Sequence, residues 1–297
     1  PTAFSVWGQG TPVCLVHGVG MRQQVWAPQV QALAQDFQVI TCDMPGHGQS
    51  DVPPEGVQLA HYADRLRELL DHLGIERAHV VGHSMGALVA LEFALNCPQR
   101  CLRVAALNAV FCRTAEQSAA VIQRADSLRT TGIEATLDAT LARWFDPASA
   151  PDIQHMATQV RGFLSGVNLD GYRRTYALFA RSDRAHETRL RQLQVPALFL
   201  TGELDANSQP AMSQAMAQLA PQGIAQPLPG ARHMMPLTHA SEVNARLLAS
   251  RMPSTSNMAL SGKPPAKLMM PGLPSSLNSS RMAEVSTLLR RSANCIG

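Results

Sequence analysis

Lysine is almost missing from this sequence of 297 residues. The only two lysines, Lys263 and Lys267, lie beyond Met252, where the chain is rich in Ser, Pro and Met and has no aromatic residue. A segment of this composition buries too little apolar surface to offset the entropy of ordering it. We therefore expect residues 253–297 to be mostly disordered, with a short helix at Arg281–Arg291, and to lie outside the main fold.

Charge and long apolar runs are also scarce. The formal net charge is +3, the sequence pI is about 8.7, and the arginines are scattered without forming a basic stripe. We therefore expect no nucleic-acid partner. No secretory signal and no apolar stretch of membrane-spanning length is visible, so we expect no membrane partner either. The sequence begins at Pro1 rather than Met, and we expect its amino terminus to be processed or incomplete.

None of the six cysteines forms a C-x-x-C pair. Cys14 and Cys42 lie inside apolar runs that are typical of buried strands. Together with the missing secretory signal, this pattern predicts reduced thiols in a cytoplasmic protein.

Apolar runs typical of buried strands alternate with helical patterns over much of the chain. We expect strands near residues 12–16, 37–42, 79–82, 103–108, 195–201 and 224–228. We expect helices between them at residues 26–35, 59–73, 85–96, 209–219 and 241–250. This alternation predicts an α/β fold with a mostly parallel, doubly wound sheet that binds ligands at the carboxyl ends of its strands.

The alternation stops between Phe111 and about Leu193. Four helical segments follow one another there, at Ala115–Arg129, Ile133–Trp144, Pro151–Leu164 and Gly171–Ala180. We therefore expect residues 1–112 and 194–252 to form the α/β core and residues 113–193 to form an inserted helical cap.

The strand near residues 79–82 ends in Gly82-x-Ser84-x-Gly86 and is followed directly by a helix. A strand, a sharp turn and a helix around this pattern form a nucleophile elbow, in which the serine takes a strained backbone conformation and the two glycines allow close packing. The free N–H groups at the start of the helix, from Met85 onward, point towards the reacting group. Ser84 is therefore the candidate nucleophile.

Two further turns carry candidates for the other roles of such a site. Asp205 follows the strand near residues 195–201, where a carboxylate can orient a histidine, and Glu203 is its local rival. His233 follows the last strand and can reach back over the sheet; His239 is a weaker rival because we expect it inside the next helix. The turn His17-Gly18-Val19-Gly20 would bring a backbone N–H to the same edge of the sheet.

The loop 43–50 contains Asp43 and His47, which could be mistaken for catalytic groups. Glycine and proline make it a rigid turn, so we expect both side chains to brace the loop.

The order Ser84, Asp205, His233 and the turns around these residues resemble the α/β-hydrolase superfamily. The further landmarks are His17-Gly18, Asp43-x-Pro45-Gly46-x-Gly48-x-Ser50, Gly202-x-x-Asp205 and the glycine before His233, and they span Pro12 to about Ser250. The resemblance implies a Ser-His-Asp triad, an oxyanion hole formed by the backbone N–H groups of Val19 and Met85, and no metal or organic cofactor. Two departures are a short amino-terminal segment, Phe4–Gln9, so that edge strands are expected to be missing, and the tail after Met252.

Within that superfamily, Arg143-Trp144-Phe145 and Asp170-Gly171-Tyr172 resemble the cap of the 3-oxoadipate enol-lactonases, which open a carboxylated lactone in aromatic degradation. This resemblance implies that Arg143 and Trp144 bind substrate. Arg161, Arg173 and Arg174 are further cap arginines; each is either part of a solvated helix face or a ligand for a substrate carboxylate.

We therefore expect a serine hydrolase that cleaves a small carboxylic ester or lactone through an acyl-enzyme. A carbon–carbon bond hydrolase of aromatic ring-cleavage products, using the same triad, is the alternative. A receptor-like binder without turnover is a further alternative from another class.

Overall fold

The structure is a computed structural model, which describes residues 1–146 and 148–249. The expected tail, 253–297, and its helix at Arg281–Arg291 lie outside these residues. Seven strands of the described part form one sheet in the order β1-β3-β2-β4-β5-β6-β7. Their bounds are β1 Phe4–Trp7, β2 Thr11–Val16, β3 Phe37–Cys42, β4 Ala78–His83, β5 Cys101–Leu107, β6 Ala197–Gly202 and β7 Gly223–Leu228.

The strands β2 to β7 run parallel to their neighbours, and only β1 is antiparallel, to β3. Central strands that are buried on both faces favour apolar side chains on both, which explains Val80-Val81 in β4 and the apolar run Ala197–Leu200 in β6. The short segment 4–9 supplies a single edge strand, β1. The predicted α/β class with a mostly parallel sheet is confirmed.

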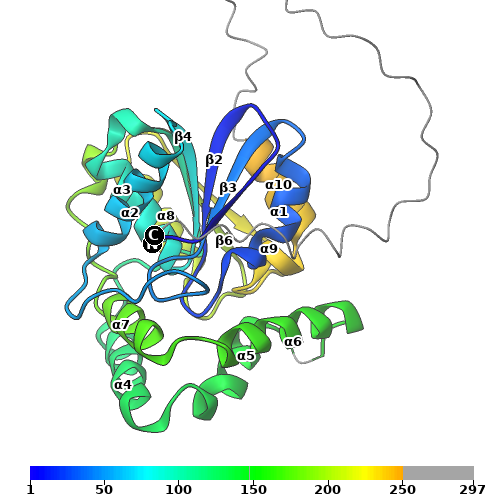
Figure 1. The fold of residues 1–297 in the computed structure, drawn as a ribbon. Coiled ribbons are helices and arrows are strands. Elements are labelled where there is room, and N and C mark those ends of the chain that lie inside the picture. Colours follow the sequence, from blue (N-terminus) through cyan, green and yellow to red (C-terminus); the bar gives the residue numbers. More distant parts are fainter. Residues whose placement is uncertain (147, 250–297) are drawn as a thin grey trace, which may run out of the picture. The chain divides into compact units, whose positions relative to one another are not determined.

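Helices cover both faces of the sheet (Figure 1). One face carries α1 (Ala27–Leu33) and α10 (Ala240–Ala249), and the other carries α2 (Leu59–His72), α3 (Met85–Asn96) and α8 (Pro210–Leu219). Every residue of α3 from Met85 to Ala94 is buried, and all of them except Glu92 are apolar or glycine, which allows burial on all sides of the helix.

The short helix α9 (Met235–Thr238) precedes α10, and His239 lies in the turn between them. The expectation that His239 lies inside a helix is therefore wrong. Pro236 near the start of α9 favours a separate short helix, because proline is well tolerated in a first helical turn.

Between β5 and β6, the described residues form four α-helices: α4 (Ala115–Thr131), α5 (Leu137–Trp144), α6 (Pro151–Ser165) and α7 (Leu169–Ala180). We call residues 113–193 the cap. The predicted helix 133–144 is divided into a 3₁₀ turn at Glu134–Thr136 and α5. Within the cap α4 packs against α7, and α5 against α6.

Buried polar contacts hold the cap to the sheet domain, one from α7 and others from the segment that follows α7. The hydroxyl groups of Tyr62 in α2 and Thr175 in α7 lie 2.7 Å apart. After α7, His186 Nε2 and Arg189 contact the buried Glu92 carboxylate of α3 at 3.0 and 2.8 Å. These contacts fix the cap over the edge of the sheet where the parallel strands end.

Candidate active site

Ser84 lies at the sharp turn between β4 and α3. Its backbone has φ 56° and ψ −117°, a conformation that residues other than glycine rarely adopt. A Cβ on Gly82 would lie 2.0 Å from the carbonyl oxygen of Gly86, and one on Gly86 would lie 2.1 Å from that of Val16. Both positions therefore require glycine, because only backbone this close together produces the elbow.

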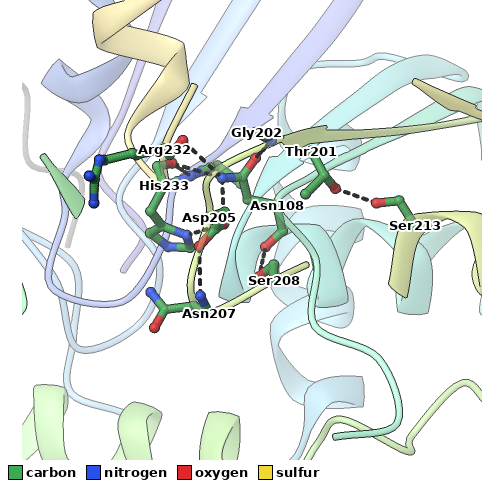
Figure 2. Close-up of polar contacts among 10 residues, drawn as sticks. Asn108, Thr201, Gly202, Asp205, Asn207, Ser208, Ser213, Arg232 and His233 are labelled. Atoms are coloured by element: carbon green, nitrogen blue, oxygen red, sulfur yellow. Dashed lines mark hydrogen bonds and ion pairs between the residues drawn. The ribbon is translucent and has the colours of Figure 1, made fainter. Parts of the chain in front are cut away.

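His233 and Asp205 lie together in two turns at the carboxyl ends of β7 and β6 (Figure 2). Nδ1 of His233 is 2.7 Å from Oδ2 of Asp205, and both side chains are buried. The other carboxylate oxygen of Asp205 accepts the backbone N–H of Asn207 at 2.8 Å. Because the carboxylate accepts the Nδ1–H bond, it orients the imidazole with Nε2 free for a reacting group.

The rival residues are used elsewhere. The Glu203 carboxylate is exposed and accepts the backbone N–H of Gly230 at 2.9 Å, bracing the turn that leads to His233. Nδ1 of His239 lies 2.9 Å from the hydroxyl of its neighbour Thr238. In the described part of the chain, neither side chain forms a hydrogen bond or an ion pair with Asp205 or His233.

Asn108 is not indicated by the sequence, although it connects this pair to the sheet (Figure 2). Its Nδ2 donates to Oδ2 of Asp205 at 2.7 Å and to the backbone carbonyl of His233 at 3.0 Å. Asn108 is fully buried at the end of β5 and has a positive φ of 50°. An asparagine directly after a buried strand is a weak signal, since asparagine tolerates this backbone conformation in many turns.

His83, next to Ser84, is a second residue of the candidate site that the sequence does not indicate. Its Nε2–H donates to the backbone carbonyl of His233 at 2.8 Å, and the two rings lie 4.9 Å apart. Burial and the neighbouring His233 lower the pKa of His83 to about 3, so its ring is neutral. The position of His233 is therefore held by donors from both β4 and β5.

The turn 17–20 lies beside Ser84, since a Cβ on Gly18 would be 3.1 Å from that of Ser84. The Gly18 carbonyl accepts Nδ1–H of His17 at 2.8 Å and the backbone N–H of Met21 at 3.2 Å. In a trans peptide the N–H points opposite to the carbonyl, so these bonds set the direction of the Val19 N–H. The Met85 N–H is in the first turn of α3, where backbone donors have no acceptor within the helix.

Asp43 and His47 brace the loops around that turn. Asp43 accepts the backbone N–H groups of Gln23 and Gln49 at 2.7 and 3.0 Å, and Nε2 of His47 accepts the Gly20 N–H at 2.9 Å. The prediction that both residues have a structural role in this loop is confirmed.

A cavity of about 220 Å³ lies between this arrangement and the cap. Val19, Ser84 and His233 line it from the sheet domain, and cap residues complete its wall. The cap residues include Arg113, Gln117, Arg124, Leu128, Thr140, Arg143, Trp144, Tyr172, Tyr176 and Phe179. Ser84 and His233 therefore face one small, partly apolar chamber, which is the usual form of a small-molecule site.

Arg143 and Trp144 both belong to that wall. The Trp144 ring stacks on the His233 imidazole with 5.3 Å between centroids and 30° between planes. The other cap arginines named from the sequence lie outside the wall. Arg161 pairs with Asp138, Arg173 with Asp170 at 3.3 Å, and Arg174 NH1 donates to the Pro53 carbonyl at 2.5 Å.

Neither a membrane span nor a metal site is found in the part of the chain that the structure describes. No helix among residues 1–146 and 148–249 is long and apolar enough to cross a membrane. Within the same ranges, no group of three or more His, Cys, Asp or Glu side chains could hold a metal ion. The five described cysteines are free, while Cys295 lies outside the described residues.

A family model for the alpha/beta hydrolase fold matches residues 11–240. The chain belongs to the α/β-hydrolase family. Among the relatives of this α/β-hydrolase is the (E)-2-((N-methylformamido)methylene)succinate hydrolase of Acinetobacter baylyi. It is 36% identical over 243 residues, which cover 82% of this chain and 90% of the relative.

The resemblance to enol-lactonases is confirmed by two further matches. The 3-oxoadipate enol-lactonase 1 of Acinetobacter baylyi is 29% identical over 189 residues, covering 64% of this chain and 69% of the relative. The crystal structure of the enol-lactonase from Burkholderia xenovorans superposes with a TM-score of 0.77 at 26% identity, covering 84% of this chain and 95% of that one. This α/β-hydrolase therefore has hydrolases as relatives along most of its described length.

Proposed function

We propose that this α/β-hydrolase cleaves a small carboxylic ester or lactone, in the manner of the 3-oxoadipate enol-lactonases. Ser84 would be the nucleophile, His233 the general base and Asp205 the group that orients it. The proposal is supported above all by the 2.7 Å contact of His233 Nδ1 with Asp205 in the wall of the same cavity as the strained Ser84.

In the first half of the reaction, Ser84 Oγ attacks the substrate carbonyl carbon while Nε2 of His233 takes the hydroxyl proton. The developing oxyanion accepts hydrogen bonds from the backbone N–H groups of Val19 and Met85. The intermediate then expels the alcohol oxygen, which takes the proton from His233, and an acyl-enzyme on Ser84 remains. A lactone stays attached through its acyl carbon at this stage.

In the second half, water attacks the acyl carbon and gives its proton to Nε2 of His233. The new tetrahedral intermediate releases Ser84 Oγ, which recovers the proton, and a carboxylic acid leaves. Throughout, the Asp205 carboxylate accepts the Nδ1–H bond and stabilises the imidazolium that forms. The chain's own residues account for each proton transfer in this scheme.

Two other kinds of bond, an amide and a carbon–carbon bond, are also candidates for cleavage. The relative from Acinetobacter baylyi is named for a succinate that carries a formamido group through a methylene carbon, which favours an amide carried by a small dicarboxylic acid as a second candidate. A carbon–carbon bond hydrolase would use the same three residues, and analysis of the products distinguishes these reactions. A receptor-like binder would show a slow single turnover with tight retention of the ligand.

The first test is the intact mass of the protein after incubation with an uncharged fluorophosphonate. We expect one adduct on the wild type and on the control Ser241→Ala, whose serine is exposed in α10, and none on Ser84→Ala. Turnover of any ester substrate should fall by about 10⁴-fold or more in Ser84→Ala, because the covalent route is lost. A folded wild type without an adduct, or full activity in Ser84→Ala, would contradict the proposal.

A further inference from the structure

The charges on the cavity wall are all of one sign. Arg113, Arg124 and Arg143 line the cavity, and none of its other lining residues is an aspartate or glutamate. Buried or half-buried cations usually have an anionic partner, because removing them from water is otherwise unfavourable. The question for each of the three arginines is therefore whether a carboxylate of the protein pairs with it.

Arg113 has an internal partner. Its guanidinium lies 3.6 Å from the Asp183 carboxylate, donates to the carbonyls of Phe179 and Ala180 at 3.5 and 3.4 Å, and stacks over the Phe179 ring at 4.7 Å. These contacts balance its charge and fix its plane. Arg113 is thus part of the cap's structure.

Among the residues that the structure describes, the hydrogen-bond partners of Arg124 in α4 and Arg143 in α5 are neutral. Nε of Arg124 donates to the Tyr176 hydroxyl at 3.4 Å, and NH2 of Arg143 donates to the Thr140 hydroxyl at 3.1 Å. Within residues 1–146 and 148–249, no carboxylate lies at ion-pair distance from either side chain. The buried Nε of Arg143 has no hydrogen-bond partner in that part of the chain.

The two guanidinium groups also repel each other. Burial lowers the pKa of Arg143, and the charge of Arg124 lowers it further. Two like charges that share one wall without an acid between them form a site that an anion would stabilise.

This pair lies close to the reacting groups. Trp144, the residue after Arg143, stacks on the His233 ring, and consecutive Cα atoms are only about 3.8 Å apart. Arg124 and Arg143 line the same small cavity as Ser84 and His233, so a small molecule with its carbonyl at Ser84 can reach the two arginines with its other end.

We propose that Arg124 and Arg143 form a clamp for a carboxylate of the substrate that is separate from the carbonyl attacked by Ser84. This inference rests on the proposed function and narrows its substrates to monoesters, lactones or amides of small dicarboxylic acids. The product is then a dicarboxylate, with one end in the clamp and the other at Ser84.

The test is protection of Ser84 from the uncharged fluorophosphonate by succinate, glutarate and adipate, each compared with its neutral diamide. We expect at least one diacid to protect the wild type while its diamide does not. Arg124→Gln and Arg143→Gln should need about 10- to 100-fold more diacid, because each loses hydrogen bonds to a charged group. Arg161→Gln, which removes an exposed cap arginine outside the cavity, should behave as the wild type.

Two controls separate the possible failures. Thermal unfolding checks that the variants are folded, and Arg124→Lys and Arg143→Lys keep the charge but lose the forked donors, so they should be protected to an intermediate degree. If the wild type is labelled but no diacid protects it, or the Gln variants are protected equally, the clamp is wrong and the hydrolase proposal stands. If the folded wild type is not labelled, the hydrolase proposal fails, and the clamp is then tested by measuring diacid binding with calorimetry. The clamp proposal is overturned if the wild type and the Gln variants bind the diacid equally, or if none of them binds it.

Discussion

Asn108 links three parts of the candidate site that are far apart in the sequence. Its amide donates to Asp205 and to the carbonyl of His233, its own carbonyl accepts the Ser208 hydroxyl at 2.7 Å, and its Oδ1 accepts the Gly202 N–H at 3.4 Å. It is not part of the cavity wall. We therefore propose Asn108 as a positioning residue, because its hydrogen bonds join Asp205 to the loop that carries His233.

Replacing Asn108 by aspartate keeps the size and shape of the side chain, but it replaces the amide that donates to the Asp205 carboxylate with a second carboxylate. A second carboxylate 2.7 Å from Oδ2 of Asp205 removes a donor and adds repulsion. We expect Asn108→Asp to lower kcat by about 10- to 100-fold, since a hydrogen bond to a charged group is lost. Because the introduced carboxyl group can donate again once it is protonated, the ratio of variant to wild-type kcat should fall as the pH rises.

The control for this change is Asn168→Asp, in which the new carboxylate can still cap α7 by accepting the Gly171 N–H, now bonded at 3.0 Å. Its activity should equal that of the wild type at every pH. If the kcat of Asn108→Asp stays within twofold of the wild-type kcat at every pH measured, Asn108 does not position the Asp205–His233 pair.

The residues of the site differ in how far the sequence predicts them. Ser84 follows from its glycine spacing, and Asp205 is favoured over Glu203 by its distance from the strand end. Asn108 and His83 cannot be found in this way, since their importance depends on turns that meet only in three dimensions. Arg124 is not predicted either, because helix α4 carries several polar residues and its periodicity does not show which of them faces the cavity.

At the scale of elements, the cap and the sheet domain approach each other backbone to backbone. A Cβ on Gly171 at the start of α7 would lie 2.4 Å from the carbonyl oxygen of Gly46 and 2.5 Å from its Cα. These are backbone atoms, so no side-chain rotation could relieve the clash. The next residue, Tyr172, is part of the cavity wall.

Gly171→Ala should therefore move α7 away from the loop 43–50 and change the cavity. We expect a loss of about 1–3 kcal/mol in the free energy of unfolding, as for other overpacked sites, and a higher KM. Chemical denaturation and steady-state kinetics measure the two effects.

Gly162 in α6 provides the matched control, because a Cβ there would meet no atom within 4 Å. Gly162→Ala should leave KM unchanged and stabilise the protein by roughly 0.5–1 kcal/mol, since alanine is the better helix former. Equal stability changes in the two variants would mean that the Gly46–Gly171 contact does not hold the cap.

The bounds of the cap helices can be predicted to within a few residues, because their apolar periodicity is local. The docking of α7 through two glycines cannot be predicted, since Gly46 and Gly171 are 125 positions apart in sequence and neither glycine alone indicates a contact with the other. The split of α9 from α10 is not predicted either, as a four-residue helix carries too little periodicity to be recognised.

At the scale of the whole molecule, three buried histidines connect the loops around Ser84 while remaining neutral. Burial is the main cause that lowers the pKa of His17 to about 4 and that of His47 and His83 to about 3. Each ring also acts as a hydrogen-bond partner of backbone: His17 for Met44, His47 for Gly20 and His83 for His233. Protonation would remove the acceptor nitrogens of His17 and His47.

These values predict how stability depends on pH. Below the ordinary pKa of histidine, about 6.5, the unfolded chain binds protons at these three histidines that the folded protein excludes. Their contribution to the free energy of unfolding is therefore fully present above that pH and is lost as the pH falls towards 3–4. His47→Gln removes one such group but keeps an acceptor for Gly20 N–H. The wild type should therefore lose roughly 3 kcal/mol more than His47→Gln between about pH 7 and about pH 3.5.

Urea unfolding at a series of pH values measures this difference, and His155→Gln, which replaces an exposed histidine of α6, is the control that should follow the wild-type curve. The decisive quantity is the slope between about pH 6.5 and about pH 3.5 rather than the stability at neutral pH, because the Gln side chain also changes packing. If His47→Gln follows the wild-type slope, then His47 is protonated in the folded protein, and the Gly20 N–H must be held by something other than its Nε2. The orientation of the turn 17–20, and with it the donor from Val19, would then have to depend on His17 alone.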